Sequence, residues 1–138
     1  MKPVSLTASA TLNRRSHGGG TVVLNAAAGL TVTLPASSGS GDEYEIIAGT
    51  TVTSNDYIVK VGNGTDVIAG VVSIVTDIAG VNMLATGTDD TITMNGGTKG
   101  GLLGSRLVLK DYKTGFWGVR GDLLSTSTEA SPFSATVS

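Results

Sequence analysis

Residues 21–34 read TVVLNAAAGLTVTL, and this stretch decides the fold class of the chain. In its second half, LTVTL at residues 30–34, aliphatic residues alternate with threonines. Such alternation puts aliphatic side chains on one face of an extended segment and hydroxyls on the other, which is typical of a half-buried β-strand. The first half, TVVL at residues 21–24, is also β-branched and apolar, and AAAG separates the two segments. The stretch therefore predicts two strands joined by a short turn.

Short apolar segments separated by turns continue along the rest of the chain. Ala48-Gly49 and Asn55-Asp56 are two-residue breaks that favour hairpins, and Asn and Asp tolerate the positive φ of tight turns. About nine or ten short strands, spaced roughly eight to twelve residues apart, are typical of an antiparallel β-sandwich or barrel. We predict an all-β fold of this kind. After the first two, further strands are expected at residues 43–47, 50–54, 57–61, 67–75 (a pair broken near Gly70), 81–85, 91–94, 106–112 and 116–120.

The ends of the chain differ in character from its middle. Residues 1–20 are small and polar and end in Gly18-Gly19-Gly20, which predicts an extended arm joined by a hinge to a β-sandwich or barrel domain at residues 21–124. Residues 125–138 are rich in Ser and Thr and are interpreted as a tail. We expect the arm to be flexible in the isolated protein and to become ordered against a partner.

Composition excludes several classes of function. The 138 residues include 20 Gly, 19 Thr and 14 Ser but only nine basic and eleven acidic residues, for a net charge of −2. A nucleic-acid partner is not expected, because the chain lacks the basic field that attracts polynucleotides. With no cysteine and one histidine, zinc is excluded as well. The apolar runs are too short for a membrane span and the N-terminus has no apolar leader, so neither membrane association nor export is expected.

Arrangements that support catalysis are also missing from the sequence. The histidine, His17, lies in the expected arm, and no serine occurs in a Gly-x-Ser-x-Gly motif, so a catalytic triad is not expected. Carboxylates at residues 42–45 and 89–90 leave a glycosidase open, but one Trp, three Tyr and two Phe are few for a sugar-binding cleft. Asp66 and residues 89–90 lie in turns and leave calcium open, although aspartate in a turn normally bonds the backbone. We therefore expect a protein that is not an enzyme and needs no cofactor or metal.

Four residues are candidates for contacts with a partner or with other copies of the chain. Arg14 and Arg15 either dock onto an acidic partner or keep the arm solvated. Trp117 lies in an expected strand and is either a core residue or an interface anchor, since tryptophan is enriched at binding hot spots. Phe133, the aromatic residue of the expected tail, completes the set.

Three stretches carry a resemblance to a known class of proteins. They are TVVLNAAAGLTVTLPASSGSGDEYEI at residues 21–46, LVLKDYKTGFWGVRGDL at residues 107–123 and SPFSATV at residues 131–137. With them the chain resembles virion structural proteins of tailed bacteriophages, most of all head decoration or capsid cement proteins. Similar stretches occur in tail and fibre proteins.

The resemblance implies a β-rich module, often trimeric, that sits on the outer capsid surface and clamps neighbouring subunits of the shell. Its expected partners are the major capsid protein and other copies of itself, and its expected location is the virion after synthesis in the host cytoplasm. The alternative is a tail-fibre or baseplate-associated β-module that binds a host surface glycan, and such a module would need exposed aromatic pockets. The two differ in whether the protein binds intact capsids.

Overall fold

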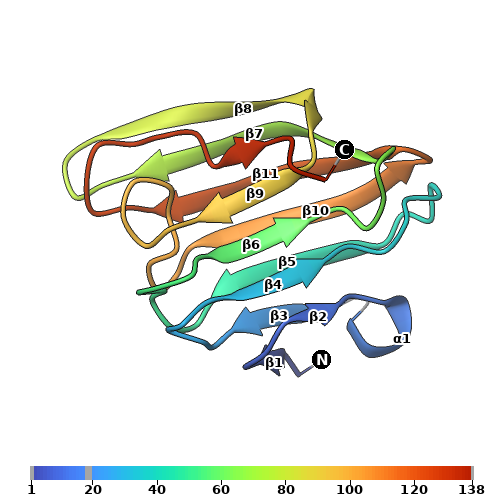
Figure 1. Ribbon diagram of the computed structural model, residues 1–138, viewed down its shortest axis with the longest axis horizontal. Helices are drawn as coiled ribbons and strands as arrows, with labels where there is room; N and C mark the ends of the chain where they lie inside the picture. The colour runs from blue at the N-terminus through green and yellow to red at the C-terminus, as the bar shows by residue number, and fades with distance from the viewer. Residues whose placement is uncertain (1, 18–19, 138) are drawn as a thin grey trace.

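The computed structural model describes residues 2–17 and 20–137 and consists of two β-sheets that face each other (Figure 1). The seven-stranded sheet has the order β1-β3-β5-β10-β11-β7-β8 and the five-stranded sheet the order β12-β9-β6-β4-β2. The prediction of an all-β sandwich is confirmed. The seven-stranded sheet contains β1 (Val4–Leu6), β3 (Thr21–Leu24), β5 (Glu43–Ala48), β7 (Val67–Val75), β8 (Gly80–Asp89), β10 (Arg106–Lys113) and β11 (Phe116–Leu124). The other contains β2 (Ala10–Thr11), β4 (Leu30–Thr33), β6 (Tyr57–Lys60), β9 (Thr91–Met94) and β12 (Phe133–Ser134), and one helical turn, α1, spans Arg14–His17.

Strands β1 to β6 alternate between the two sheets, so the expected strand directions need a correction. β1, β3 and β5 are parallel neighbours in one sheet, and β2, β4 and β6 are parallel neighbours in the other. Each of these strands is followed by one in the opposite sheet. When the chain returns to the first sheet, the new strand therefore runs in the same direction as the earlier strand beside it. The sheets are therefore mixed, not antiparallel throughout. The hairpins expected at residues 48–49 and 55–56 belong to a crossing between sheets, although Asn55 and Asp56 do have the positive φ values, 56° and 57°.

The core lies between the sheets and is built from the alternating aliphatic residues. Leu30, Val32 and Leu34 are 6%, 0% and 0% exposed, as the alternation predicts. In register, Val32 lies beside Val59 of β6, and Val22 of β3 lies beside Ile46 of β5. Parallel pairing thus places the apolar residues of neighbouring strands side by side. Their burial stabilises the fold, which has no disulfide.

Described segments from both expected ends of the chain pack on the sandwich in this structure. β1 and β2, from the expected arm, pair with β3 and β4, and Leu12 is fully buried. β12, from the expected tail, pairs with β9. The chain therefore continues both sheets beyond the expected boundaries at residues 20 and 124. Two glycines of the expected hinge, at 18 and 19, lie outside the described residues, and the flexibility of the arm stays a prediction.

Buried carboxylates fasten the long connections to the sheets. Asp66 accepts hydrogen bonds from the Ser37 amide at 2.8 Å and from the Asn63 side chain at 3.1 Å. Asp90 accepts bonds from the amides of Thr136 and Val137 at 2.9 and 3.1 Å and so holds the C-terminal segment. Both carboxylates thus do what aspartate in a turn normally does, which is to satisfy backbone donors.

Gly70 in β7 is a position where only glycine fits. Its φ is +144°, and a Cβ there would clash with the carbonyl oxygen of Val119 on the neighbouring strand β11. We expect Gly70→Ala to lower the free energy of unfolding by about 2 kcal/mol, because the substitution combines backbone strain with a steric clash. Urea unfolding measures the loss.

Gly115→Ala is the matched control for this prediction. Gly115 has a φ of +87°, and a Cβ there would meet nothing within 4 Å. The control therefore measures the cost of the backbone conformation alone. We expect it to lower the free energy of unfolding by about 1 kcal/mol. Equal losses for the two variants would contradict the steric argument.

Candidate functional site

The outer side of β8 is an open sheet edge. β8 is the last strand of the seven-stranded sheet, and within the described residues no strand pairs with its outer side. Figure 1 shows β8 along the top of the molecule, above β7. The turn expected at residues 86–90 is in fact the end of this strand, where the register with β7 shifts. The edge is ten residues long and offers its backbone donors and acceptors to another chain.

Apart from the register shift near its end, the β8 edge lacks the features that usually protect such edges. The other outermost strands, β1, β2 and β12, have only two or three residues each. Natural sheets protect longer edges with charged residues or proline, because an open edge pairs with other chains. The sequence from Ile78 to Thr88 contains neither. β8 is therefore suited to pairing with another chain.

Apolar side chains are exposed along the same hairpin. Val71 lies opposite Leu84 across the β7–β8 pair, and they are 48% and 62% exposed. Ile78, in the connecting turn, is 95% exposed. Exposed apolar side chains are typical of protein interaction sites. We name the exposed apolar residues of this hairpin the β7–β8 surface: Val71, Val75 and Leu84 share one face of the sheet, Val81 lies on the other face opposite Ile74, and Ile78 lies in the turn.

The two arginines expected to make contacts both lie on α1. The Arg14 guanidinium donates to the Asp42 carboxylate at 2.7 and 2.9 Å, and the carboxylate raises the pKa of Arg14 through this hydrogen bond and its charge. Arg15 is exposed and makes no ion pair within the described part of the chain. Arg14 therefore fastens α1 to the loop before β5, and a partner contact at Arg15 stays a prediction.

The two aromatic candidates are buried to different degrees in the single chain. Trp117 is 0% exposed and packs with Tyr44, with ring centroids 6.0 Å apart, so it is a core residue in this structure. Phe133 on β12 is partly buried and packs against the core. The sequence pattern does not separate these two roles, because a strand buries every second side chain whichever partner covers it.

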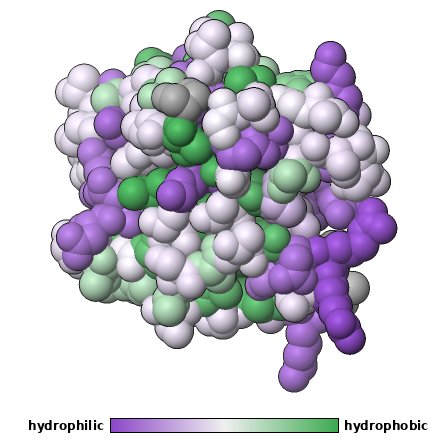
Figure 2. Space-filling model, turned by 45° about the vertical axis from the view of Figure 1, so that its right-hand side comes forward, coloured by the Kyte–Doolittle hydropathy of each residue, from purple (hydrophilic) through white to green (hydrophobic). Residues whose placement is uncertain are grey.

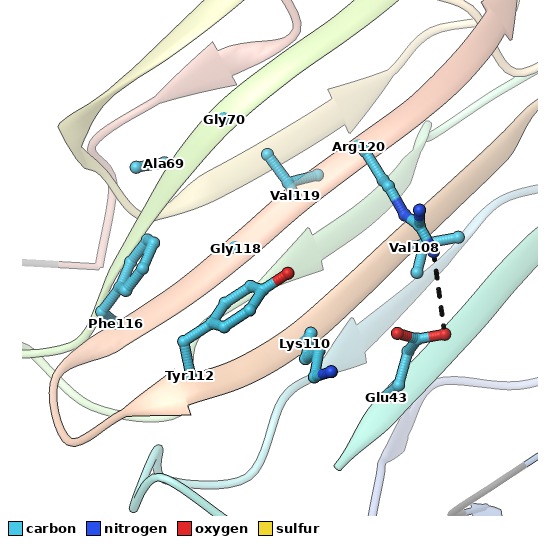
Figure 3. A pocket seen from close by; sticks show the side chains of 10 residues that line it. All are labelled: Glu43, Ala69, Gly70, Val108, Lys110, Tyr112, Phe116, Gly118, Val119 and Arg120. Carbon is cyan, nitrogen blue, oxygen red and sulfur yellow. Dashed lines mark ion pairs between the residues drawn. The ribbon is translucent and has the colours of Figure 1, made fainter. Parts of the chain in front are cut away.

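A second exposed feature is an aromatic pair on the outer face of the seven-stranded sheet (Figure 3). Tyr112 and Phe116 stack with centroids 5.8 Å apart, and the Lys110 ammonium lies 5.4 Å from the centre of the tyrosine ring. The tyrosine ring lies so close over Gly118 that a Cβ there would overlap it. Tyr112 is 58% exposed. These side chains line a shallow pocket of about 230 Å³.

The charged side chains on this outer face are arranged in pairs. Arg106 lies between Glu45 and Asp122, at 3.3 and 3.7 Å, and Arg120 lies 3.9 Å from Glu43. Exposed pairs of this kind contribute little to stability but leave the face without a field of one sign. Figure 2 shows that much of one side of the molecule has intermediate hydropathy, with strongly hydrophilic side chains gathered at the lower right.

Asp111 organises the loop between β4 and β5. Its carboxylate accepts bonds from the amides of Ser38, Gly39 and Ser40 and from the Ser40 hydroxyl, at 2.8–3.3 Å. Burial alone would raise the pKa of Asp111, but these hydrogen bonds outweigh burial and hold the pKa below its usual value. The carboxylate is therefore charged at neutral pH and serves as the anchor of this loop.

Comparison with known proteins gives no second line of argument. No protein-family model, curated protein sequence or solved structure matches this chain. Within the described residues no group of three or more His, Asp and Glu side chains is placed to hold a metal ion, and no helix is long and apolar enough to cross a membrane. The β7–β8 surface is therefore the feature on which a functional assignment can rest.

Proposed function

We propose that this protein is a non-enzymatic structural component of a phage particle, a head decoration protein that binds the outer capsid surface and stabilises the shell. The observation that carries the proposal is the ten-residue edge at β8, uncharged up to its last residue, with its exposed apolar neighbours. Pairing of this edge with a neighbouring copy satisfies its backbone groups and buries the β7–β8 surface. The resemblance of residues 21–46, 107–123 and 131–137 to phage virion proteins supplies the partner, the major capsid protein.

The contact with the shell is assigned to α1. α1 lies at the opposite edge of the sandwich from β8 (Figure 1), so one copy can contact a neighbour and the shell at the same time. Arg15 on α1 is exposed and suits an acidic patch on the capsid. In an oligomer each such contact is repeated, and the repeated contacts add to a firm attachment through avidity.

Capsid binding tests this proposal directly. Purified protein is mixed with preformed, undecorated capsids, sedimented with them, and the capsids are heated with and without it. We expect saturable binding and a higher temperature of capsid disruption. Arg15→Glu should weaken capsid binding without changing the oligomeric state, whereas Lys99→Glu, in the loop between β9 and β10, should change neither. Failure of the unmodified protein to sediment with any capsid of its phage would overturn the assignment.

The aromatic pair on the outer face supports the tail-module alternative as a second candidate. Tyr112, which is exposed, and the partly buried Phe116 offer a ring surface on which a sugar ring can stack. In that case the protein binds host surface glycans and not capsids, and Tyr112→Ala abolishes the binding on a glycan array. Retention of capsid binding by Tyr112→Ala, with no glycan binding by the parent, rejects this candidate.

A further inference from the structure

A polar pocket opens at one end of the sandwich, where α1 and the loop before β5 meet the core. Its volume is about 350 Å³, and we name it the end pocket. Small-molecule sites usually span roughly 300–1,000 Å³, so the end pocket has room for about one small ring. A single water occupies only roughly 30 Å³. Its lining includes Arg14, Pro35, Asp42, Tyr44, Asp111 and Trp117.

Two buried polar atoms in the lining have no hydrogen-bond partner. They are the Tyr44 hydroxyl and the Trp117 indole Nε1, and both residues are 0% exposed. Buried polar groups are nearly always paired, so each unpaired group needs an explanation. The indole N–H can only donate, and the phenol can donate or accept. Both groups are therefore suited to an occupant that presents acceptor oxygens.

The charges around the pocket decide which kind of occupant it can accept. Burial raises the pKa of the Tyr44 phenol, and the carboxylates of Asp42 and Asp111 raise it further against the opposing effect of Arg14. Tyr44 is thus a neutral donor, and two carboxylates lie near it. The Asp111 carboxylate already accepts hydrogen bonds from its loop, and the Asp42 carboxylate is paired with Arg14, so neither is left unpaired for a cation. An anion in the pocket would be repelled by the two carboxylates.

We propose that the end pocket binds one ring of a neutral sugar. Sugar hydroxyls accept hydrogen bonds from the indole N–H and the phenol, and they donate to the remaining lone pairs of Asp42. Pro35 gives the pocket an apolar wall for the C–H face of the ring. This site is separate from the β7–β8 surface and from Tyr112, while Arg14 of α1, the element assigned to the capsid contact, lines one side of it.

The single tryptophan makes the site directly observable. With one Trp in the chain, the indole N–H gives one cross-peak in a proton–nitrogen NMR spectrum. Titrations with D-glucose, D-galactose, D-mannose and N-acetyl-D-glucosamine are compared with glycerol and with phosphate. We expect a saturable shift for at least one sugar, with a dissociation constant of about 1–10 mM given the small size of the ligand. Glycerol and phosphate should give no saturable shift.

Two variants and one control locate the binding. Tyr44→Phe removes one hydroxyl and should weaken binding about fivefold or more, while Tyr112→Phe, which removes an exposed hydroxyl outside the pocket, should leave it unchanged. Ala36→Phe fills the mouth from an exposed loop position and should abolish binding without touching the core. If Tyr44→Phe does not fold, the Ala36→Phe variant alone tests whether the sugar binds in the end pocket.

Two results would contradict sugar binding in the end pocket. Shifts that stay linear for all four sugars up to about 100 mM would mean that the pocket holds water only, and the proposal would be withdrawn. Binding that survives Ala36→Phe would place the sugar elsewhere and also reject it. Capsid sedimentation of the same variants separates this result from the proposed function, because neither substitution lies on β8 or on α1.

Discussion

Asp111→Ala is expected to lower the free energy of unfolding by about 3 kcal/mol. The substitution leaves the amides of Ser38, Gly39 and Ser40 without their acceptor in a region where Asp111 itself is only 2% exposed. The three amides lose hydrogen bonds to a charged acceptor, and the loop before β5 loses its anchor. Urea unfolding followed by circular dichroism gives the difference.

Asp122→Ala is the control for this loss. Asp122 is on β11, its side chain is 63% exposed, and its ion pair with Arg106 is long, at 3.7 Å. Removal of such a carboxylate should change stability by less than about 0.5 kcal/mol. If both variants lose the same amount, the hydrogen bonds to the loop are not the cause.

The pH dependence follows from the depressed pKa of Asp111. A carboxylate whose pKa is lower in the folded state contributes stability that is fully present above its unfolded pKa, which is about 3.9. This contribution is lost as the pH falls through the folded value. The stability difference between the unmodified protein and Asp111→Ala should therefore be constant near neutral pH and shrink below about pH 4. A difference that grows with acidity would contradict the depressed pKa.

The fold class follows from the sequence because alternation is a local property. The burial of Leu30, Val32 and Leu34 needs only that one face of a strand meets a core, and that condition is visible in five residues. Positive φ at Asn55 and Asp56 is likewise a property of the residues themselves. Strand direction is different, because the same alternating strand fits a parallel or an antiparallel neighbour equally well.

The parts that the sequence does not reveal depend on contacts between distant segments. The bonds from Ser38 and Gly39 to Asp111 join residues more than seventy positions apart, and nothing local distinguishes this aspartate from one exposed in a hairpin. Trp117 is similar, since its burial depends on Tyr44 across the sheet. One feature of the sequence does point to the open edge of β8: residues Ile78 to Thr88 carry no charge. Only the order of strands in the sheet shows that β8 is the outermost strand.

The second large effect is expected in the assembly of the oligomer. By light scattering, we expect the purified protein to form a trimer, as its resemblance to decoration proteins implies, and Leu84→Lys to convert it to a monomer by weakening association about 100-fold or more. Leu84 is 62% exposed in the single chain, so the substitution leaves the monomer's core intact while placing a charge on the edge strand. A cooperative thermal unfolding transition of the variant checks that it still folds.

Leu103→Lys is the matched control, because Leu103 is also 62% exposed but lies in the loop between β9 and β10, outside the β7–β8 surface. It adds the same charge and removes the same exposed apolar area, so only the location differs. A trimer for Leu103→Lys and a monomer for Leu84→Lys assign assembly to β8. A dimer of the parent that Leu84→Lys dissociates would keep β8 as the interface, with two antiparallel edges meeting about a twofold axis, and would reject the threefold arrangement. A monomeric parent would remove self-assembly from the proposal altogether and leave the exposed edge to be covered by the shell.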